Sequence, residues 1–316
     1  MKIGYNPPSM EAYNSLLKTG RGMHMSSARL STGIKINKAS QNAAGLAISN
    51  TLRVQAEGVE KASQNSSNAI SLLQTVEGAL SEMHAIMQRI RELAVQASND
   101  TNEIDDRESL QKEINQLVAE LDSMSDRCEY NQIKLLRGGG NETRYDADGN
   151  IIREPLFLTF HTGANKGYNT TIEIPSVSSL TLGLEDGGTF WSIAGINVAA
   201  EAAPPVGPLP SGVVPPLSPE VARDMRTRAL ETADAAVEML SRHRANLGAY
   251  MNRLQHTVNY LDASHTAASA SLSRIYDTDM AAEMSNYSRL QVLTQTATSI
   301  MAQANQTPQN VLQLLQ

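Results

Sequence analysis

Residues 59–97 read VEKASQNSSNAISLLQTVEGALSEMHAIMQRIRELAVQA, and this stretch decides the fold. Its apolar and small side chains return at alternating steps of three and four residues, and Ser66 is the only polar member of the series. A heptad pattern of this length is typical of a helix that packs lengthwise against other helices. The series is Val59, Ala62, Ser66, Ala69, Leu73, Val76, Leu80, Met83, Met87, Ile90, Ala94 and Ala97.

Two further heptad series accompany the first. The polar stretch 98–102 predicts a loop, and the short connection makes the next helix an antiparallel neighbour of the first. A third helix is predicted near the C-terminal end, where a four-residue step to Val258 shifts the pattern as a stutter does. The second series is Leu110, Ile114, Leu117, Leu121 and Met124, and the third is Ala229, Ala233, Ala236, Leu240, His243, Leu247, Tyr250, Leu254, Val258, Leu261, His265, Ala268, Leu272 and Ile275.

A compact insert separates these helical regions. Residues 138–220 hold nine of the twelve prolines, twelve of the twenty glycines, all three Phe and the single Trp. The β-rich runs 156–160 and 170–174 predict a hairpin, and 179–184 predicts a further strand. Residues 146–150 form a turn that resembles a fragment of a calcium loop without its helical flanks, so no metal site is predicted. The proline-rich run 204–219 predicts a surface connection.

Composition narrows the class of protein. Aromatic residues make up 4% of the chain, which is low for a compact enzyme core but sufficient for helices packed through Leu, Met, Val and Ala. The net charge of −7 argues against a nucleic-acid partner. The single cysteine, Cys128, excludes an internal disulfide. The sequence shows neither a signal-peptide core nor an apolar run long enough for a membrane span, so we expect export by a route without a cleavable signal.

The last 27 residues, 290–316, carry no charged side chain. Gln, Asn, Thr and Ser alternate there with apolar residues, whereas a lone surface helix normally carries charges. This composition favours a helix that is buried in an assembly of copies. In the free monomer such a helix is expected to be marginal.

Several motifs in order then resemble those of bacterial flagellins. The N-terminal ones are LSTGIKIN at 30–37, AAGLAI at 43–48 and IRELAVQASN at 90–99. The C-terminal ones are ANLGA at 245–249, NRL at 252–254, DTDMAA at 277–282, MAQANQ at 301–306 and PQNVL at 308–312. The chain departs from the family pattern at Gln41 and Asn42, which replace an acidic pair, and at Pro7 and Pro8. We expect the first helix to begin after Pro8, with Ser9 as its cap.

The resemblance implies a mainly α protein in which the two ends of the chain come together to form the same domains. Residues 1–45 and 277–316 would be the two halves of a coiled-coil filament-core domain, and 46–137 with 221–276 a rod domain of three long helices. Residues 138–220 would be a β-hairpin and proline-rich surface insert. The predicted filament-core contacts are Leu30, Ile34, Ile36, Leu46, Ile48, Met284, Leu293, Ile300, Met301, Val311, Leu312 and Leu315.

The resemblance also implies partners. The chain would polymerise with itself into the extracellular flagellar filament after unfolded export by flagellar type III secretion. A flagellar export chaperone, the filament cap and hook–filament junction proteins would contact it. Family members are also ligands of Toll-like receptor 5 through a patch centred on an arginine of the first rod helix, with a glutamate from the second. The matching positions are predicted to be Gln88, Arg89, Leu93 and Glu120.

Three other hypotheses remain at this point. A hook–filament junction protein shares the terminal motifs. A chemoreceptor-like signalling hairpin would share the heptads, but it would need a membrane span and a tight helical tip in place of the insert. An enzyme would need a site, and His161, His243 and His265 have no nucleophile, carboxylate or metal-ligand partner at a meaningful spacing. We therefore predict neither catalysis nor a cofactor.

Overall fold

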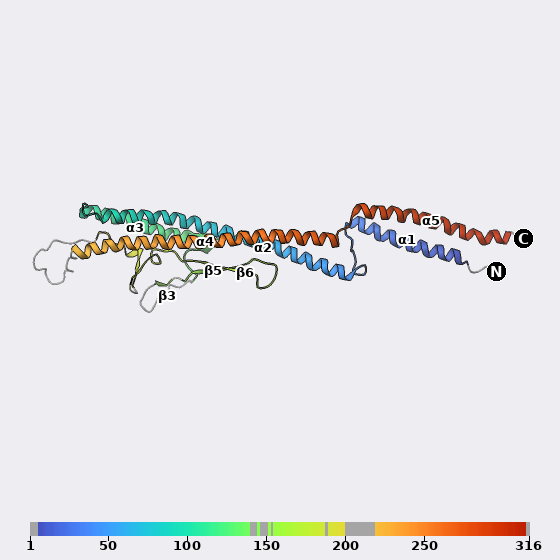
Figure 1. Cartoon of the computed structure of the whole chain (residues 1–316), viewed down its shortest axis with the longest axis horizontal. Helices are drawn as coiled ribbons and strands as arrows, with labels where there is room; N and C mark the ends of the chain where they lie inside the picture. Colours follow the sequence, from blue (N-terminus) through green and yellow to red (C-terminus); the bar gives the residue numbers. More distant parts are fainter. Residues whose placement is uncertain are drawn as a thin grey trace, which may run out of the picture. The chain divides into compact units, whose positions relative to one another are not determined.

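The computed structural model describes residues 6–139, 144–145, 151–152, 154–186, 189–199 and 219–313. Long helices dominate, and the short strands pair as antiparallel hairpins (Figure 1). The helices are α1 (Pro7–Thr32), α2 (Ala43–Ala97), α3 (Ile104–Arg127), α4 (Pro219–Tyr276) and α5 (Met280–Gln313), with a 3-10 turn, η1, at Ile193–Gly195. The strands are β1 (Glu129–Tyr130), β2 (Ile133–Lys134), β3 (Arg144–Tyr145), β4 (Ile151–Ile152), β5 (Leu156–His161), β6 (Asn169–Ile174), β7 (Gly183–Asp186) and β8 (Thr189–Ser192).

The chain forms two compact units. Unit 1 comprises Met1–Val59 and Ala263–Gln316, and unit 2 comprises Glu60–Asp262. Both ends of the chain therefore contribute to one unit, because α1 and α5 pair with each other although almost the whole sequence separates them. The other unit holds α3, most of α2 and α4, and the described strands of the insert, while the first part of α2 and the last part of α4 belong to unit 1.

In unit 1, α1 and α5 run antiparallel (Figure 1). The amide of Asn6 donates to the carbonyl of Ala304 at 2.9 Å, and at the opposite end of α1 the hydroxyl of Ser26 donates to the carbonyl of Glu283 at 3.4 Å. The helices approach closely at Gly22, where an added Cβ would lie 3.3 Å from Leu290 Cδ2. The buried residues of these two helices in the described part of the chain are all small, Ala12, Ser26 and Ala297, so the contact buries little apolar area for its length.

The start of α1 differs from the prediction. The helix begins at Pro7, and its cap is Asn6, whose side chain accepts from the backbone N–H of Ser9 at 3.4 Å. Pro7 and Pro8 occupy the first two helical positions, where a missing N–H costs nothing because those groups have no partner within the helix. The prolines therefore open the helix instead of delaying it to Ser9.

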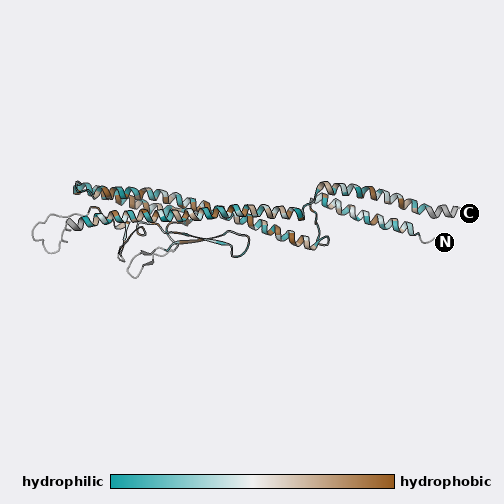
Figure 2. Cartoon of the chain, in the orientation of Figure 1, coloured by the Kyte–Doolittle hydropathy of each residue, from teal (hydrophilic) through white to brown (hydrophobic). Residues whose placement is uncertain are grey.

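In unit 2, α2, α3 and α4 lie side by side (Figure 1). All twelve residues of the first heptad series are buried, from Val59 at 5% exposure to Ala97 at 0%. Hydrophobic residues recur along all three helices (Figure 2). The polar member, Ser66, is satisfied because its hydroxyl donates to the carbonyl of Ala62 at 2.9 Å. The predicted loop is also confirmed, since α2 ends at Ala97 and α3 begins at Ile104.

Polar contacts between α2 and α4 fix their relative position along the helix axes. Arg244 pairs with Glu77 at 2.8 Å, and the hydroxyl of Ser63 donates to Asp262 at 2.8 Å. Arg91 also pairs with Asp234. Heptad side chains alone permit slippage by a whole repeat, and these polar contacts favour one register.

The insert packs onto the helices through one face of its hairpin. The predicted hairpin is β5–β6, and Ile172 and Ile174 of β6 are fully buried in the same core as the helices. The predicted strand 179–184 is wrong in its first half. Ser179 lies in a turn, and its N–H and hydroxyl both donate to the carboxylate of Asp122 on α3, at 2.8 and 2.6 Å. Strand β7 begins only at Gly183. Residues 146–150 and 204–218 of the predicted loops lie outside the described residues.

Candidate assembly and receptor-contact surfaces

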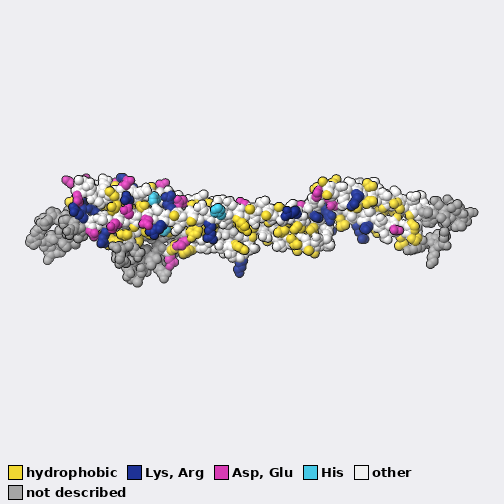
Figure 3. Space-filling view, viewed as in Figure 1, with side chains coloured by type: hydrophobic (Ala, Val, Ile, Leu, Met, Phe, Trp, Pro, Cys, Tyr) yellow, Lys and Arg dark blue, Asp and Glu magenta, His cyan; other side chains and the backbone are white. Residues whose placement is uncertain are grey.

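Unit 1 exposes a large amount of apolar side chain. Figure 3 shows hydrophobic side chains spread over α1 and α5. Of the eighteen exposed large apolar residues in the described part of the chain, eleven belong to unit 1, each with 41% or more of its surface accessible, and seven belong to unit 2. Monomeric proteins rarely expose apolar surface on this scale unless it binds something. The exposed large apolar residues of unit 1 are Met10, Tyr13, Leu17, Met25, Ile48, Val54, Met280, Met284, Val292, Leu293 and Ile300.

On α1 these residues form a stripe that faces away from α5. A helix advances about 100° per residue, so Met10, Tyr13, Leu17 and Met25 fall within about 120° of one another. We call these four residues the α1 outer stripe. The residues of α1 that meet α5, including the buried Ala12 and Ser26, lie on the opposite side of the helix. The stripe is therefore left uncovered by the described residues of the monomer.

A second stripe lies on α5. Met280, Met284 and Val292 also fall within about 120° of one another, and we call them the α5 outer stripe. The α5 positions that contact α1, such as Leu290 and the buried Ala297, lie on another side of the helix. Leu293 and Ile300 line the groove between the two helices, a cavity of about 440 Å³.

The structure places the predicted filament-core residues at different depths. Ile48, Met284, Leu293 and Ile300 are exposed, with 44% to 53% of their surface accessible. Ile36 is buried at 7% exposure, so it packs within the monomer. The partly buried members are Leu30, Ile34, Leu46 and Met301. Val311 and Leu312 lie in α5 but their side chains are outside the described residues, as is all of Leu315.

The sequence predicts inner filament contacts from the apolar stripes of 10–48 and 280–315, but the individual residues named for them include no member of the α1 outer stripe, and neither Met280 nor Val292. The signal was present, because Met10, Tyr13 and Leu17 stand at the three- and four-residue steps of an amphipathic helix.

The arginine patch on α2 is exposed and strongly paired. The Arg89 guanidinium donates from Nε and Nη2 to Glu113 Oε1 of α3, at 3.0 and 2.8 Å, and from Nη1 to Glu92 at 3.2 Å. These hydrogen bonds, to Glu113 first and then to Glu92, raise the pKa of Arg89. The amide of Gln88 lies 3.1 Å from His84 Nε2 on the same helix.

The other two residues of the predicted receptor contact lie elsewhere. Leu93 is buried in the core at 1% exposure, so it offers the surface no side chain. Glu120 is exposed but pairs with Arg127 at 2.5 Å, and it stands two turns, about 10 Å, along α3 from Glu113. The carboxylate that faces Arg89 is thus Glu113, which sequence reasoning missed because the offset between α2 and α3 is a tertiary property.

Comparison with known families gives the identity of this architecture. Residues 3–141 match the bacterial flagellin N-terminal helical region, and residues 230–315 match the bacterial flagellin C-terminal helical region. The two matches together span well over half of the chain. The chain belongs to the bacterial flagellin family.

Full-length relatives agree with this assignment. This flagellin chain is 39% identical over 324 residues to the flagellin of Bacillus subtilis strain 168, with 100% of both proteins covered. It is 36% identical over 315 residues to flagellin FlaB2 of Treponema pallidum strain Nichols, again with 100% of both covered. The flagellin of Listeria monocytogenes serovar 1/2a is 36% identical over 316 residues, covering 100% of this chain and 99% of the relative.

Solved flagellin structures were also found. Flagellin of Bacillus cereus is 24% identical and has a TM-score of 0.39, covering 63% of this chain and 88% of the other. FliC from Burkholderia pseudomallei is 20% identical with a TM-score of 0.38, covering 58% and 99%. The family assignment rests on the sequence matches, and the flagellin resemblance and the mainly α fold class predicted from the sequence are confirmed.

Family membership gives this flagellin its general role. It is a subunit of a flagellar filament that polymerises with copies of itself, and its flagellin relatives are structural proteins. The chemoreceptor-like hypothesis is therefore set aside. None of the described helices is long and apolar enough to cross a membrane.

The histidines considered as catalytic candidates have structural surroundings in this flagellin. His161 Nδ1 lies 2.6 Å from the Asn169 amide oxygen across the β5–β6 hairpin. His243 is partly buried on α4, where burial first and then Arg242 lower its pKa, against the opposing effect of Glu173. His265 is partly buried farther along α4. Among the described residues no group of three or more His, Cys, Asp or Glu is arranged to hold a metal ion.

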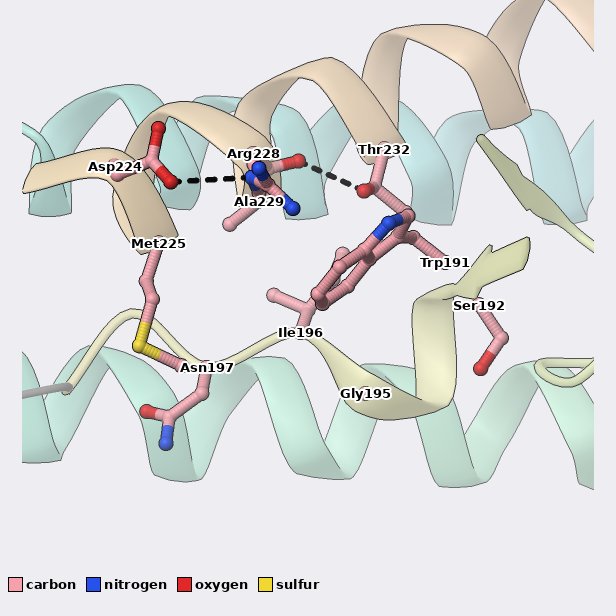
Figure 4. A pocket seen from close by; sticks show the side chains of 10 residues that line it. All are labelled: Trp191, Ser192, Gly195, Ile196, Asn197, Asp224, Met225, Arg228, Ala229 and Thr232. Carbon is pink, nitrogen blue, oxygen red and sulfur yellow. Dashed lines mark hydrogen bonds and ion pairs between the residues drawn. The ribbon is translucent and has the colours of Figure 1, made fainter. Parts of the chain in front are cut away.

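A pocket of about 320 Å³ between η1 and α4 holds the single tryptophan (Figure 4). The Arg228 guanidinium carbon lies 4.9 Å from the centroid of the Trp191 ring, and Asp224 pairs with Arg228 at 3.2 Å. Cation–π contacts of this kind contribute about 0.5–1 kcal/mol at exposed sites. The contact between Arg228 and Trp191 therefore holds β8 against α4 and helps to attach the insert to the helices.

Proposed function

We propose that this chain is exported unfolded by flagellar type III secretion and assembles outside the cell into the flagellar filament through unit 1. The uncovered apolar stripes of α1 and α5 support this proposal most directly. The two stripes differ in sequence and lie on different helices. A contact between the stripe of one copy and a different face of the next copy would therefore be heterologous. Heterologous contacts propagate into open polymers instead of closing into a dimer.

The energetics favour assembly. Full burial of one large apolar side chain contributes roughly 1.5–3 kcal/mol. The eleven exposed apolar residues of unit 1 therefore offer on the order of 10 kcal/mol or more, against association costs of about 4–15 kcal/mol. Segment 290–316 has no charged side chain, so its burial on assembly carries no desolvation cost for a charge.

Unfolded export is compatible with the covalent structure. Cys128 is the single cysteine, so the chain has no internal disulfide to hold it folded in a narrow channel. We propose the flagellar export chaperone, the filament cap and the hook–filament junction proteins as partners on this route. We further propose that 1–45 and 277–316 act as the filament-core domain, 46–137 and 221–276 as the rod domain, and 138–220 as the surface insert.

Electron microscopy of the purified chain tests the assembly proposal. The protein is concentrated with short filament seeds and examined by negative stain. Long tubes of uniform width are expected. Persistent monomers in the presence of seeds would contradict the proposal, as would normal filaments grown from protein whose two ends a protease has removed.

A second proposal concerns recognition by Toll-like receptor 5. The supporting observation is the exposed arginine of the first rod helix, Arg89, paired with a glutamate of the second, Glu113. We propose that Arg89, Gln88 and Glu113 form the contact surface. Leu93 supports it from within the core, and Glu120 lies at its periphery.

Receptor signalling in a reporter cell line tests this surface. Arg89→Ala is expected to lower potency about tenfold or more, because one charge-assisted contact is worth roughly 1.5–3 kcal/mol. Arg242→Ala is the matched control, since Arg242 is also exposed and paired on its own helix, with Glu238 at 3.0 Å. Equal potency of the two variants would refute the proposed surface, and filament formation should survive both changes.

A further inference from the structure

We propose that oxidation of Met10, Met25, Met280 and Met284 by hydroperoxides stops the subunit from assembling. The inference rests on the proposed role of unit 1 in assembly. It adds a chemical modification of that surface, with a peroxide as the reagent class.

Methionine dominates the two outer stripes. Of the seven residues in the α1 and α5 outer stripes, four are methionines, and they expose 52% (Met10), 46% (Met25), 46% (Met280) and 51% (Met284) of their surface. Their thioethers are therefore open to a dissolved oxidant before assembly. If the stripes become subunit contacts, the same thioethers are covered in the polymer.

Other methionines of the chain provide an internal comparison. Met83 and Met87 belong to the first heptad series and are 0% exposed in the core of unit 2. Peroxide must reach the sulfur to react, so these two side chains are protected in the folded protein. The structure thus predicts a division between methionines of the stripes and methionines of the core.

The chemistry balances with a hydroperoxide as the single co-reactant. A lone pair of the thioether sulfur attacks the terminal oxygen, the O–O bond breaks, and a sulfur–oxygen bond forms, while the proton of the attacked oxygen passes to the departing oxygen. Sulfur is oxidised by two electrons, and the hydroperoxide is reduced to the corresponding alcohol, or to water in the case of hydrogen peroxide. The product is methionine sulfoxide, which is polar and costly to bury in an apolar contact.

The first experiment treats free subunits with hydrogen peroxide and removes the oxidant before seeding. Peptide mass spectrometry is expected to find a gain of one oxygen at the four stripe methionines and none at Met83 or Met87. The critical concentration for assembly should rise at least about tenfold, since several buried sulfoxides each weaken the contact. Peroxide applied to finished filaments should modify the four residues far more slowly.

Two variants separate the stripe methionines from other targets of peroxide. The quadruple variant Met10→Leu, Met25→Leu, Met280→Leu, Met284→Leu keeps side-chain volume and polarity close to those of the original. It should assemble normally and continue to do so after peroxide treatment. The control Met83→Leu, Met87→Leu should remain as peroxide-sensitive as the unmodified chain.

The outcomes distinguish this inference from the assembly proposal. If untreated protein does not polymerise, the assembly proposal fails. If untreated protein polymerises and the oxidised protein does so equally well, this inference is refuted. Equal peroxide sensitivity of the quadruple variant and the unmodified chain would refute it as well.

Discussion

A buried arginine shows how single residues set local stability in unit 2. Arg226 is 6% exposed. Its burial has the largest effect in lowering its pKa, and the positive charges of Arg107 and Arg223 lower it further, whereas the carboxylate of Asp100 raises it. Asp100 pairs with Arg223 at 2.6 Å and with Arg226 at 3.5 Å. One carboxylate at the α2–α3 loop thus serves two guanidinium groups, one of which is almost removed from water.

We expect Asp100→Asn to destabilise unit 2 by about 1–2 kcal/mol, because it leaves the buried charge of Arg226 without its counter-ion. The solvent exposure of Asp100 itself keeps this loss small. Urea unfolding followed through Trp191, the only tryptophan, measures the change. Asp234→Asn is the control, since it breaks an ion pair with Arg91 in which both side chains are about half exposed. Asp234→Asn should cost less than about 1 kcal/mol, and a larger loss for it than for Asp100→Asn would contradict this account.

His243 makes the stability of unit 2 depend on pH. Its pKa is lowered in the fold, so the unfolded chain binds a proton more readily. Stability is therefore unaffected at high pH and falls as pH drops through the ordinary histidine value of about 6.5. The loss levels off below the lowered pKa of the folded state.

Stability is expected to decline between pH 7.5 and about 5.5, by at most about 1.4 kcal/mol from this group. Denaturation midpoints measured across this range should show a shallower decline for His243→Gln. His256→Gln, which changes an exposed histidine of the same helix, should leave the decline as it was. Identical pH profiles for the unmodified chain and His243→Gln would remove His243 as the cause.

At the scale of elements, α1 presents two faces with different surroundings. One face carries Ala12, Gly22 and Ser26 and meets α5 within the monomer. The other carries the α1 outer stripe, which has no partner among the described residues of the chain. A change to the stripe should therefore affect assembly and leave the folded monomer intact.

Leu17→Asp places a charge in the middle of this stripe, where Leu17 is 41% exposed. Burial of an unpaired carboxylate in a subunit contact is costly, so we expect filament formation to be lost or its critical concentration to rise more than about tenfold. Circular dichroism of the monomer should be unchanged. Leu17→Met keeps the apolar volume and should assemble normally; filaments from Leu17→Asp at the ordinary concentration would show that the stripe is not an interface.

At the scale of the whole molecule, the two units differ in how much apolar core they possess. Unit 2 buries large side chains such as Leu73, Leu80 and Met87 completely. The contact between α1 and α5 buries mainly small residues, and a helix pair with so little core is marginal in water. We therefore expect a stable body with ends that gain stability from neighbouring copies on assembly.

Hydrogen–deuterium exchange can compare the units directly. In free subunits, amides of the α2–α4 core are expected to exchange slowly and those of α1 and α5 quickly. After assembly the exchange of α1 and α5 should slow by orders of magnitude, with core peptides of unit 2 as the internal reference. Equal protection of α1 and the unit 2 core in the free subunit would contradict this division.

The heptads show how far sequence alone reaches. All twelve positions of the series that begins at Val59 are buried as predicted, because helical periodicity is local and a side chain's face follows from its position in the repeat. Other local signals located two more features: the polar stretch 98–102 located the α2–α3 loop, and the β-rich runs 156–160 and 170–174 located the β5–β6 hairpin. The absence of charged residues from 290–316 indicated that the C-terminal end differs from an ordinary surface helix.

Sequence reasoning failed where the answer depended on contacts between elements. Glu113, not Glu120, faces Arg89, since the axial offset of α3 against α2 selects the partner and no local pattern encodes it. Leu93 is buried because the face of α2 on which it lies is covered in the helical bundle. Ser179 lies in a turn, where its N–H and its hydroxyl donate hydrogen bonds to the carboxylate of Asp122 on α3.

The sequence by itself thus determined the long helices, the hairpin and the family, since periodicity and ordered motifs are properties of the chain. Only the tertiary structure decided which charges pair, which apolar residues are enclosed and which stripes of α1 and α5 stay uncovered. The physical reason is that ion pairs and burial depend on distances between segments far apart in sequence, and packing alone sets those distances.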